Sequence, residues 1–263
     1  MRNRGRSAVF LCYHSIAPEG PRWLTVSREL FEAQLDELAR RGFASGGLAE
    51  LEALAAGQRL ARPTAFLTFD DGFLDNHETV APLLRERGLK AFVFVLPPLV
   101  DAGAPLAWPE VAEDERRFPA RMRSVTWEML GAMREAGFEV GSHGLTHAHL
   151  PELAPTALRD ELLDSRRRIE ARLGSCPTFA YPFGEWSPAV AAAAAECGYS
   201  FAFTLPKHGQ AGAEPLSIPR INVDYRDSGR RLGFKLSTLG RRYYLAPARG
   251  SLRDGLSRRR GRR

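Results

Sequence analysis

Short apolar runs alternate with amphipathic segments along most of this chain. Each run is bounded by glycine, proline or charged residues and has the length of a buried strand rather than of a helix. These runs predict strands over residues 9–13, 65–69, 91–96, 138–140, 178–181, 201–204 and 218–223.

Between the runs, apolar residues recur at helical spacing. Ser27 is a suitable N-cap for a helix that ends before Gly42, and further helices are predicted over residues 48–56, 79–87, 127–136, 156–173 and 188–197. Residues 97–124 have no clear period and are expected to form a long insertion or lid. Strands that alternate with helices predict an α/β fold with a parallel sheet, here closed as a barrel.

Composition and charge divide the chain into two parts. A chain of 263 residues with 44% hydrophobic residues fits one domain, which we expect to span residues 1–240. The net charge is +6, but residues 241–263 hold nine arginines and one aspartate, a charge of +8, so residues 1–240 sum to −2. This tail is expected to be disordered, and it either contacts an anionic membrane surface or is simply solvated. We expect no specific nucleic-acid partner, and the sequence leaves the oligomeric state open.

The three cysteines, Cys12, Cys176 and Cys197, are odd in number and form no CxxC pair, which suits a reducing compartment. The sequence shows no secretion signal and no apolar run long enough to span a membrane. We therefore expect a cytoplasmic protein, with peripheral membrane contact as a further option.

Two adjacent carboxylates end one of the predicted strands. Asp70 and Asp71 follow the run 65–69 and precede Gly72, which permits the chain to turn. At the carboxyl end of a parallel strand both acids can reach a bound metal or a reacting water. The alternative is a strand followed by an ordinary Asp-Gly turn.

Three of the six histidines lie within seven residues, at His143, His147 and His149. A spacing of four would place His143 and His147 on the same side of one helical turn. Imidazole and carboxylate are the usual ligands of zinc and similar metals. His149 is the rival for the second histidine position, and the Glu of an HExxH helix is absent.

Three motifs together resemble a known family. TFDDG at residues 68–72, SHxxxH at 142–147 and FAYPFG at 179–184 resemble the polysaccharide deacetylases, also called the NodB homology domain or carbohydrate esterase family 4. The resemblance covers most of residues 8–224. It implies a distorted (β/α) barrel of about seven parallel strands and a metal-dependent hydrolase that removes N-acetyl groups from an amino-sugar glycan.

The resemblance also implies a role for each matched residue. Asp70 matches the general base, and the metal ligands would be Asp71, His143 and His147. Tyr181 stands where the family supplies a backbone N–H to the oxyanion. The cofactor would be one divalent metal, with zinc as the first choice and cobalt, nickel, manganese and iron as alternatives.

The sequence departs from the better-known members in two ways. It lacks their arginine in the third motif and the Leu-x-His that supplies their general acid. It resembles instead the exopolysaccharide deacetylase branch, whose members act on poly-N-acetylglucosamine and related glycans and use a Tyr-His after the first strand. That implies His14 as the acid, with His208 as the remaining candidate. Arg220 would pair with Asp70 and keep it ionised, or form a purely structural ion pair.

The remaining candidates concern substrate and function. Phe183, Trp186 and Leu145 would wall the acetyl pocket, or they are core residues. The alternative functions are an O-acetyl esterase, a hydrolase of other non-peptide C–N bonds, and a catalytically silent carbohydrate-binding module.

Overall fold

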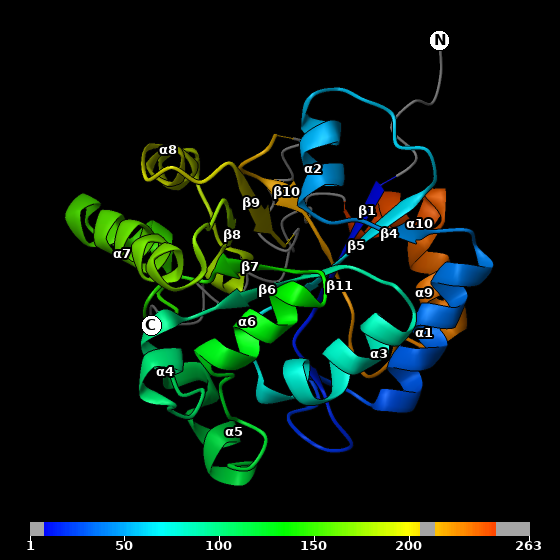
Figure 1. The fold of residues 1–263 in the computed structure, drawn as a ribbon, viewed down its shortest axis with the longest axis horizontal. Helices are drawn as coiled ribbons and strands as arrows, with labels where there is room; N and C mark the ends of the chain where they lie inside the picture. The colour runs from blue at the N-terminus through cyan, green and yellow to red at the C-terminus, as the bar shows by residue number, and fades with distance from the viewer. Residues whose placement is uncertain (1–7, 206–213, 246–263) are drawn as a thin grey trace, which may run out of the picture.

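A parallel sheet forms the centre of the protein in the computed structural model, which describes residues 8–205 and 214–245 (Figure 1). Six of its strands lie side by side in the order β9-β8-β7-β6-β5-β1. They are β1 (Ala8–Tyr13), β5 (Thr64–Phe69), β6 (Ala91–Val95), β7 (Phe138–Ser142), β8 (Thr178–Ala180) and β9 (Phe201–Thr204). All six follow the predicted apolar runs.

A broken seventh strand closes this sheet into a barrel. β10 (Ile218–Pro219) pairs with β9, and β11 (Ile221–Asn222) pairs with β1 on the opposite edge. Only Arg220 separates the two pieces, so one extended segment bridges both edges of the sheet. The expected α/β fold, a distorted barrel of about seven parallel strands, is confirmed.

Three short strands supplement the barrel. β4 (Ala44–Ser45) pairs with the first residues of β5. β2 (Ser15–Ile16) and β3 (Thr25–Val26) form a separate pair directly after β1.

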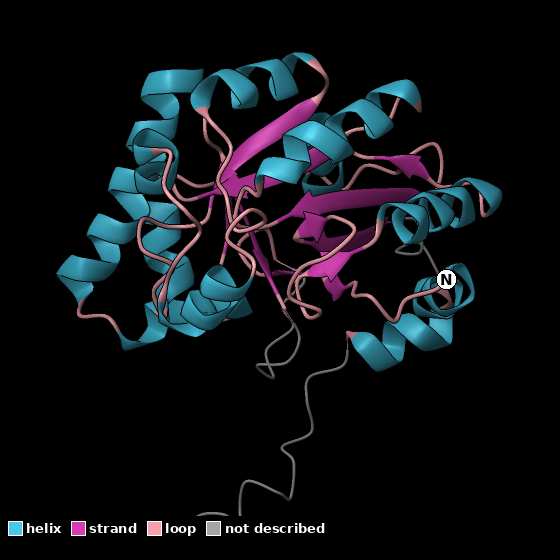
Figure 2. Ribbon diagram, turned by 90° about the horizontal axis from the view of Figure 1, so that it is seen from below, coloured by secondary structure: helices cyan, strands magenta, loops and turns pink. Residues whose placement is uncertain are grey.

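Helices cover the outside of the barrel (Figure 2). Ser27 caps α1 (Arg28–Arg40) by accepting a hydrogen bond from the Leu30 N–H at 3.2 Å, as the sequence predicts. The other predicted helices are α2 (Leu48–Ala55), α3 (Ala81–Glu86), α6 (Trp127–Glu135), α7 (Pro155–Leu173) and α8 (Pro188–Glu196). A single π-helical turn, Asn76–Val80, leads into α3.

The segment without a sequence period contains short helices of its own. These are α4 (Pro97–Ala102), a 3₁₀ turn at Pro109–Val111 and α5 (Ala112–Arg117). Each is too short to produce a periodic pattern. The segment packs Leu106, Trp108 and Met122 against Phe73, just after the two aspartates, and so covers one side of that strand end.

Two C-terminal helices follow the barrel and were not predicted. α9 (Gly229–Leu236) packs on α1, and α10 (Thr238–Tyr244) follows after Ser237 (Figure 1). The expectation of a disordered tail from residue 241 is therefore wrong for residues 241–244, which are helical. The rest of that tail, residues 246–263, lies outside the described residues.

Phenylalanines fill the barrel interior. Phe66, Phe92, Phe94 and Phe203 are all fully buried and come from β5, β6 and β9. Their rings lie 5.3–6.4 Å apart, within the range of favourable aromatic contacts. Gly141 faces this cluster, and a Cβ there would lie 2.6 Å from the Phe94 ring. The aromatic layer is a packed floor beneath the polar residues at the carboxyl ends of the strands.

Candidate active site

Strand alternation directs the polar residues into the barrel interior. Cys12 and His14 continue the inward series that begins at Phe10, while Thr68 and Asp70 continue the series from Phe66. Because Phe10 pairs with Phe66 and Cys12 with Thr68 in the register of β1 and β5, the two polar sets lie side by side.

Asp70 is held by the guanidinium of Arg220. Nη1 donates to Oδ1 at 2.6 Å, and Nη2 donates to Oδ2 at 2.7 Å. Arg220 also donates to Thr68 Oγ1 at 3.0 Å and lies 5.8 Å from the Phe94 ring centroid. The pairing that the sequence analysis considered for Arg220 is thus present.

This pair controls the charge of Asp70. Burial alone would raise the pKa of Asp70, but the charge and hydrogen bonds of Arg220 outweigh it and hold that pKa well below its ordinary value. Asp70 is therefore an ionised carboxylate despite an exposed side-chain fraction of 4%.

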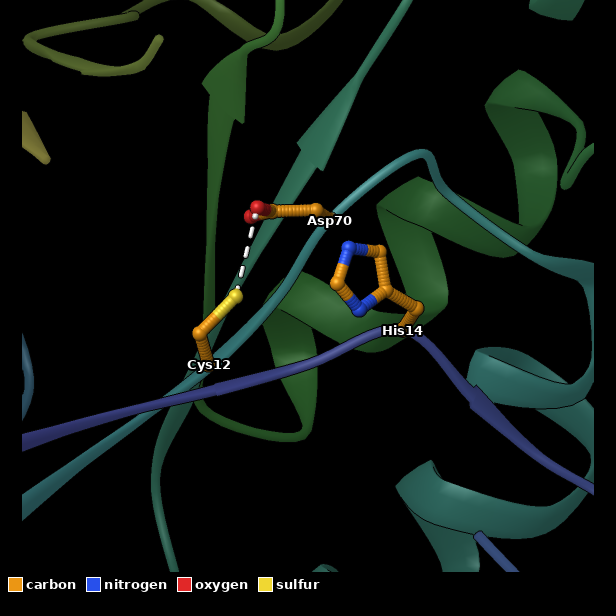
Figure 3. Close-up of side chains that lie close together, drawn as sticks. All are labelled: Cys12, His14 and Asp70. Atoms are coloured by element: carbon orange, nitrogen blue, oxygen red, sulfur yellow. Dashed lines mark hydrogen bonds between the residues drawn. The ribbon is translucent and has the colours of Figure 1, made fainter. Parts of the chain in front are cut away.

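Cys12 and His14 both lie close to the same carboxylate (Figure 3). The Cys12 thiol donates to Asp70 Oδ2 at 3.4 Å, and burial raises the pKa of Cys12 well above its ordinary value, so the proton stays on sulfur. A nitrogen of His14 lies within 4.8 Å of the carboxylate and the sulfur. Burial lowers the pKa of His14, although Asp71 and Asp70 act in the opposite direction. The sequence analysis did not place Cys12 in the site and missed this contact.

Asp71, His143 and His147 form a second, separate group. Asp71 Oδ1 lies 3.4 Å from His143 Nε2 and 3.6 Å from His147 Nε2, and all three residues are buried. Asp71 reaches this group because its backbone adopts a φ of +71° and turns its side chain away from the inward series of Asp70. Gly72 follows with a φ of +69°, which glycine tolerates best.

The two histidines are not on a helix, so that expectation is wrong. They lie on a loop after β7 in which Gly144 has a φ of +86° and His147 a φ of +59°. Glu161 of α7 organises this loop by accepting hydrogen bonds from the Leu145 N–H at 2.7 Å and from the Thr146 N–H and hydroxyl. Nothing in the sequence pattern singles out Glu161 beyond its place on an amphipathic helix.

The group fits a divalent cation. His143 Nδ1 lies 2.7 Å from the Ala180 carbonyl, which can only accept, so Nδ1 carries the proton and Nε2 presents its lone pair to Asp71. Among the described residues, Asp71 Oδ1 and His147 Nδ1 are buried without a hydrogen-bond partner. Burial, and then His143, lower the pKa of His147 to about 3, so its ring is neutral at pH 7. Burial acts to lower the pKa of His143, but the negative charges of Asp70 and Asp71 outweigh it and raise that pKa. A buried carboxylate oxygen facing two imidazoles is a suitable ligand set for zinc or a similar ion.

Aromatic rings enclose the metal-binding group. Trp108 stacks on the His147 ring at a centroid distance of 4.2 Å, and Phe183 meets the same ring edge-on at 4.4 Å. His149, the rival ligand, lies outside the group: its Nδ1 lies 2.7 Å from Glu185, and its ring stacks on Phe183. Trp108 came from the segment without a period and was not among the predicted residues.

Other predicted site residues lie further from this centre. Tyr181 is buried, its hydroxyl donates to the Leu216 carbonyl, and its N–H donates to the Phe203 carbonyl at 3.0 Å. That N–H is engaged in the sheet, contrary to the expected oxyanion role. Trp186 packs beside Tyr181, and neither Trp186 nor Leu145 is among the residues that line the cleft. The alternative acid His208 lies outside the described residues.

A cleft of about 530 Å³ leads from both groups to the surface. Its inner end is formed by the two aspartates and their partners, together with Phe183. Its outer end is lined by aromatic and basic side chains, namely Trp23, Arg226, Arg231, Lys235, Tyr243 and Tyr244.

A buried network supports the backbone of His14. Asp75 accepts hydrogen bonds from Ser15 Oγ at 2.7 Å and from the Ile16 N–H at 2.9 Å. Asn76 donates to the His14 carbonyl at 2.8 Å. These contacts tie the segment after β1 to the turn that follows the aspartates.

Known proteins resemble the whole of this unit. The model of the polysaccharide deacetylase family matches residues 57–202, more than half of the chain. YxkH, a candidate polysaccharide deacetylase of Bacillus subtilis (strain 168), is 24% identical over 234 residues, which cover 87% of this chain and 76% of YxkH.

Two solved structures share the fold. The Streptococcus pyogenes deacetylase PplD in complex with acetate is 23% identical, with a TM-score of 0.75 over 88% of this chain and 98% of PplD. IcaB from Ammonifex degensii is 24% identical, with a TM-score of 0.70 over 89% of this chain and 98% of IcaB. The three motifs, the barrel and the matched family model lead to one conclusion: this chain belongs to the polysaccharide deacetylase family.

Proposed function

We propose that this protein is a metal-dependent hydrolase that removes N-acetyl groups from an amino-sugar glycan or glycan precursor. The observation that carries the proposal is the separation of two acidic groups at one cleft end. Asp70 is an ionised carboxylate bound to Arg220, whereas Asp71 faces two imidazoles. One aspartate is thus available for proton transfer while the other is available as a ligand.

The metal ligands in this proposal are Asp71, His143 and His147. A divalent cation bound there would polarise the acyl oxygen and make a nearby water more acidic. Zinc is our first choice, because one carboxylate and two imidazoles match its preferences. Cobalt, nickel, manganese and iron are tested beside it.

The protein groups account for both proton transfers. Asp70 accepts a proton from the attacking water while oxygen adds to the acyl carbon. The C–N bond then breaks, and His14 gives a proton to the leaving nitrogen, so that acetate and a free amine are produced. The position of His14 beside Asp70 supports this role, because a proton taken up by the carboxylate has a short path to the imidazole. Arg220 keeps Asp70 ionised before the reaction.

The acid group favours an amide over an ester. An amine is a poor leaving group unless its nitrogen is protonated, whereas an alcohol with a low pKa leaves without help. An O-acetyl esterase remains the second candidate, since the same water attack would serve it. The aromatic outer end of the cleft suits stacking against sugar rings, and poly-N-acetylglucosamine is the substrate we propose to test first.

The test measures acetate release from N-acetylglucosamine oligomers and from O-acetylated sugars, with each metal added in turn. We expect release from the N-acetyl substrate and its loss in Asp70→Asn. His14→Asn should lose activity on the amide and keep much of it on 4-nitrophenyl acetate, whose leaving group needs no proton. Equal loss on both substrates would contradict the acid role, and release from O-acetyl sugars alone would favour the esterase.

A further inference from the structure

The C-terminal helices carry an unusual set of exposed apolar side chains. Within residues 8–205 and 214–245, the exposed large apolar side chains are Trp23, Tyr225, Phe234, Leu239 and Tyr243. Three of them belong to α9 and α10, and Leu239 and Tyr243 are the most exposed, at 68% and 73%. We call Phe234, Leu239 and Tyr243 the α9–α10 surface.

This surface adjoins the mouth of the cleft. Leu239 and Tyr243 lie one turn apart on α10 and share a face, and Tyr243 lines the cleft. Phe234 is in the last turn of α9, and its carbonyl accepts a hydrogen bond from Ser237 at the start of α10. Trp23 lines the same cleft from the loop before β3.

Packing of the two helices does not require these side chains. α9 buries Leu232 and Leu236 and contacts α1 through Gly233, where a Cβ would lie 2.4 Å from a Glu37 oxygen. Arg241 ties α10 to the barrel by donating to the carbonyls of Leu236 and Ala8. The two helices are therefore held in place without the exposed apolar side chains.

The C-terminal segment that carries this surface is rich in basic residues, although Asp227 pairs with Arg231 and Lys235. Residues 228–263 hold twelve arginines and lysines and one aspartate, a charge of +11, so residues 1–227 sum to −5. The chain continues beyond the described helices for residues 246–263, which contain seven of these arginines. Arg230, on α9, is exposed as well. The basic C-terminal segment therefore favours a negatively charged partner.

We propose that the α9–α10 surface docks on an anionic lipid bilayer, with the mouth of the cleft turned toward the headgroups. Arginines would contact the anionic headgroups while Phe234, Leu239 and Tyr243 enter the boundary between headgroups and acyl chains. Aromatic side chains with a polar edge suit this boundary. No helix among the described residues is long and apolar enough to cross a bilayer. If the proposed function holds, the acetylated substrate is then met at the membrane surface.

Vesicle sedimentation tests the docking with the full chain. We expect binding to vesicles of phosphatidylcholine mixed with phosphatidylglycerol, and little binding to phosphatidylcholine alone. The double variant Phe234→Ser/Leu239→Ser should bind at least about tenfold more weakly, because both side chains lose their apolar contact with lipid. Arg230→Glu should weaken binding, whereas Arg167→Glu, an exposed arginine on α7, is the matched control and should not.

Two results would overturn the proposal. Vesicle binding that the Phe234/Leu239 change leaves unaltered would mean that the arginine-rich tail acts alone. Binding of a DNA or RNA duplex in preference to both vesicle types would assign the basic end to nucleic acid. Acetate release from a soluble oligomer, measured on the same variants, separates this result from the proposed function, because neither Phe234 nor Leu239 lines the cleft. Circular dichroism checks that each variant is folded.

Discussion

Arg220 and Asp70, 150 positions apart in the sequence, form a bidentate ion pair at the point where the barrel closes, and this pair keeps Asp70 ionised. Arg220 sits at the break between β10 and β11, the one point where the last strand exchanges one sheet edge for the other. Its guanidinium lies between the buried phenylalanine rings of the barrel and the Asp70 carboxylate. The structural closure of the fold and the chemistry of the site thus depend on the same side chain.

Removing Arg220 should therefore damage stability as well as activity. Arg220→Met leaves the Asp70 charge buried without a partner, which we expect to cost about 3–5 kcal/mol of unfolding free energy. The double change Asp70→Asn/Arg220→Met removes both charges and should recover much of that stability while staying inactive. Urea denaturation of the three proteins measures the effect. Equal stability of Arg220→Met and wild type would contradict the ion-pair account.

The Cys12 thiol should matter through its hydrogen bond rather than through sulfur chemistry. Cys12→Ala removes one donor to Asp70, and we expect the rate of acetate release to fall about fivefold, the equivalent of a net hydrogen bond of about 1 kcal/mol. Cys12→Ser keeps a donor and should stay closer to wild type. Cys197→Ala, directly after α8 and away from the cleft, serves as the control. A serine variant that is as impaired as the alanine variant would point to packing instead.

Glu161 should control metal affinity without binding the metal. Glu161→Gln weakens the contacts to Leu145 and Thr146 that shape the histidine loop, so zinc affinity should fall by about 10–100-fold. Asp164→Asn, an exposed acid on the same helix, is the matched control. Competition with a chromogenic chelator measures the affinities. An unchanged affinity in Glu161→Gln would mean that the loop holds its shape without this carboxylate.

Asp75 should give the protein a distinctive pH dependence of stability. Burial raises the pKa of Asp75 from 3.8 to about 6, so the folded state keeps a proton that the unfolded chain releases at lower pH. The unfolding free energy should therefore fall as pH rises from about 4 to about 6, by up to about 3 kcal/mol, and level off above that. Asp75→Asn should lack this component, since an amide does not titrate. Parallel pH profiles of the two proteins would disprove the assignment.

The barrel could be predicted from sequence because its strands are short apolar runs separated by regular helices. The positions of Asp70 and His143 followed from the same pattern, since each comes directly after a strand. The features that were not predicted from the sequence have physical explanations. The strand over residues 218–223 was predicted, but its break at Arg220 was not, because each half is only two residues long. α9 and α10 were missed because their exposed apolar side chains obscure the helical pattern.

The conformation of the histidine loop could not be predicted from the sequence pattern either. A spacing of four suggested a helical turn, whereas the loop reaches the same proximity through positive φ angles at Gly144 and His147. The contacts of Cys12 and Glu161 depend on tertiary packing between separate elements. Local sequence patterns do not show such contacts. The alternation of side chains along a strand could have suggested only that Cys12 faces the same interior as Asp70.

The assignment of separate roles to Asp70 and Asp71 is the central claim, and metal content measured beside acetate release tests it most directly. Purified wild type, Asp70→Asn and Asp71→Asn would be loaded with zinc, dialysed and analysed for bound metal and for activity on N-acetylglucosamine oligomers. We predict one equivalent of metal and activity in wild type, metal without activity in Asp70→Asn, and loss of both in Asp71→Asn. An Asp70→Asn protein that loses its metal while Asp71→Asn keeps it would contradict the account.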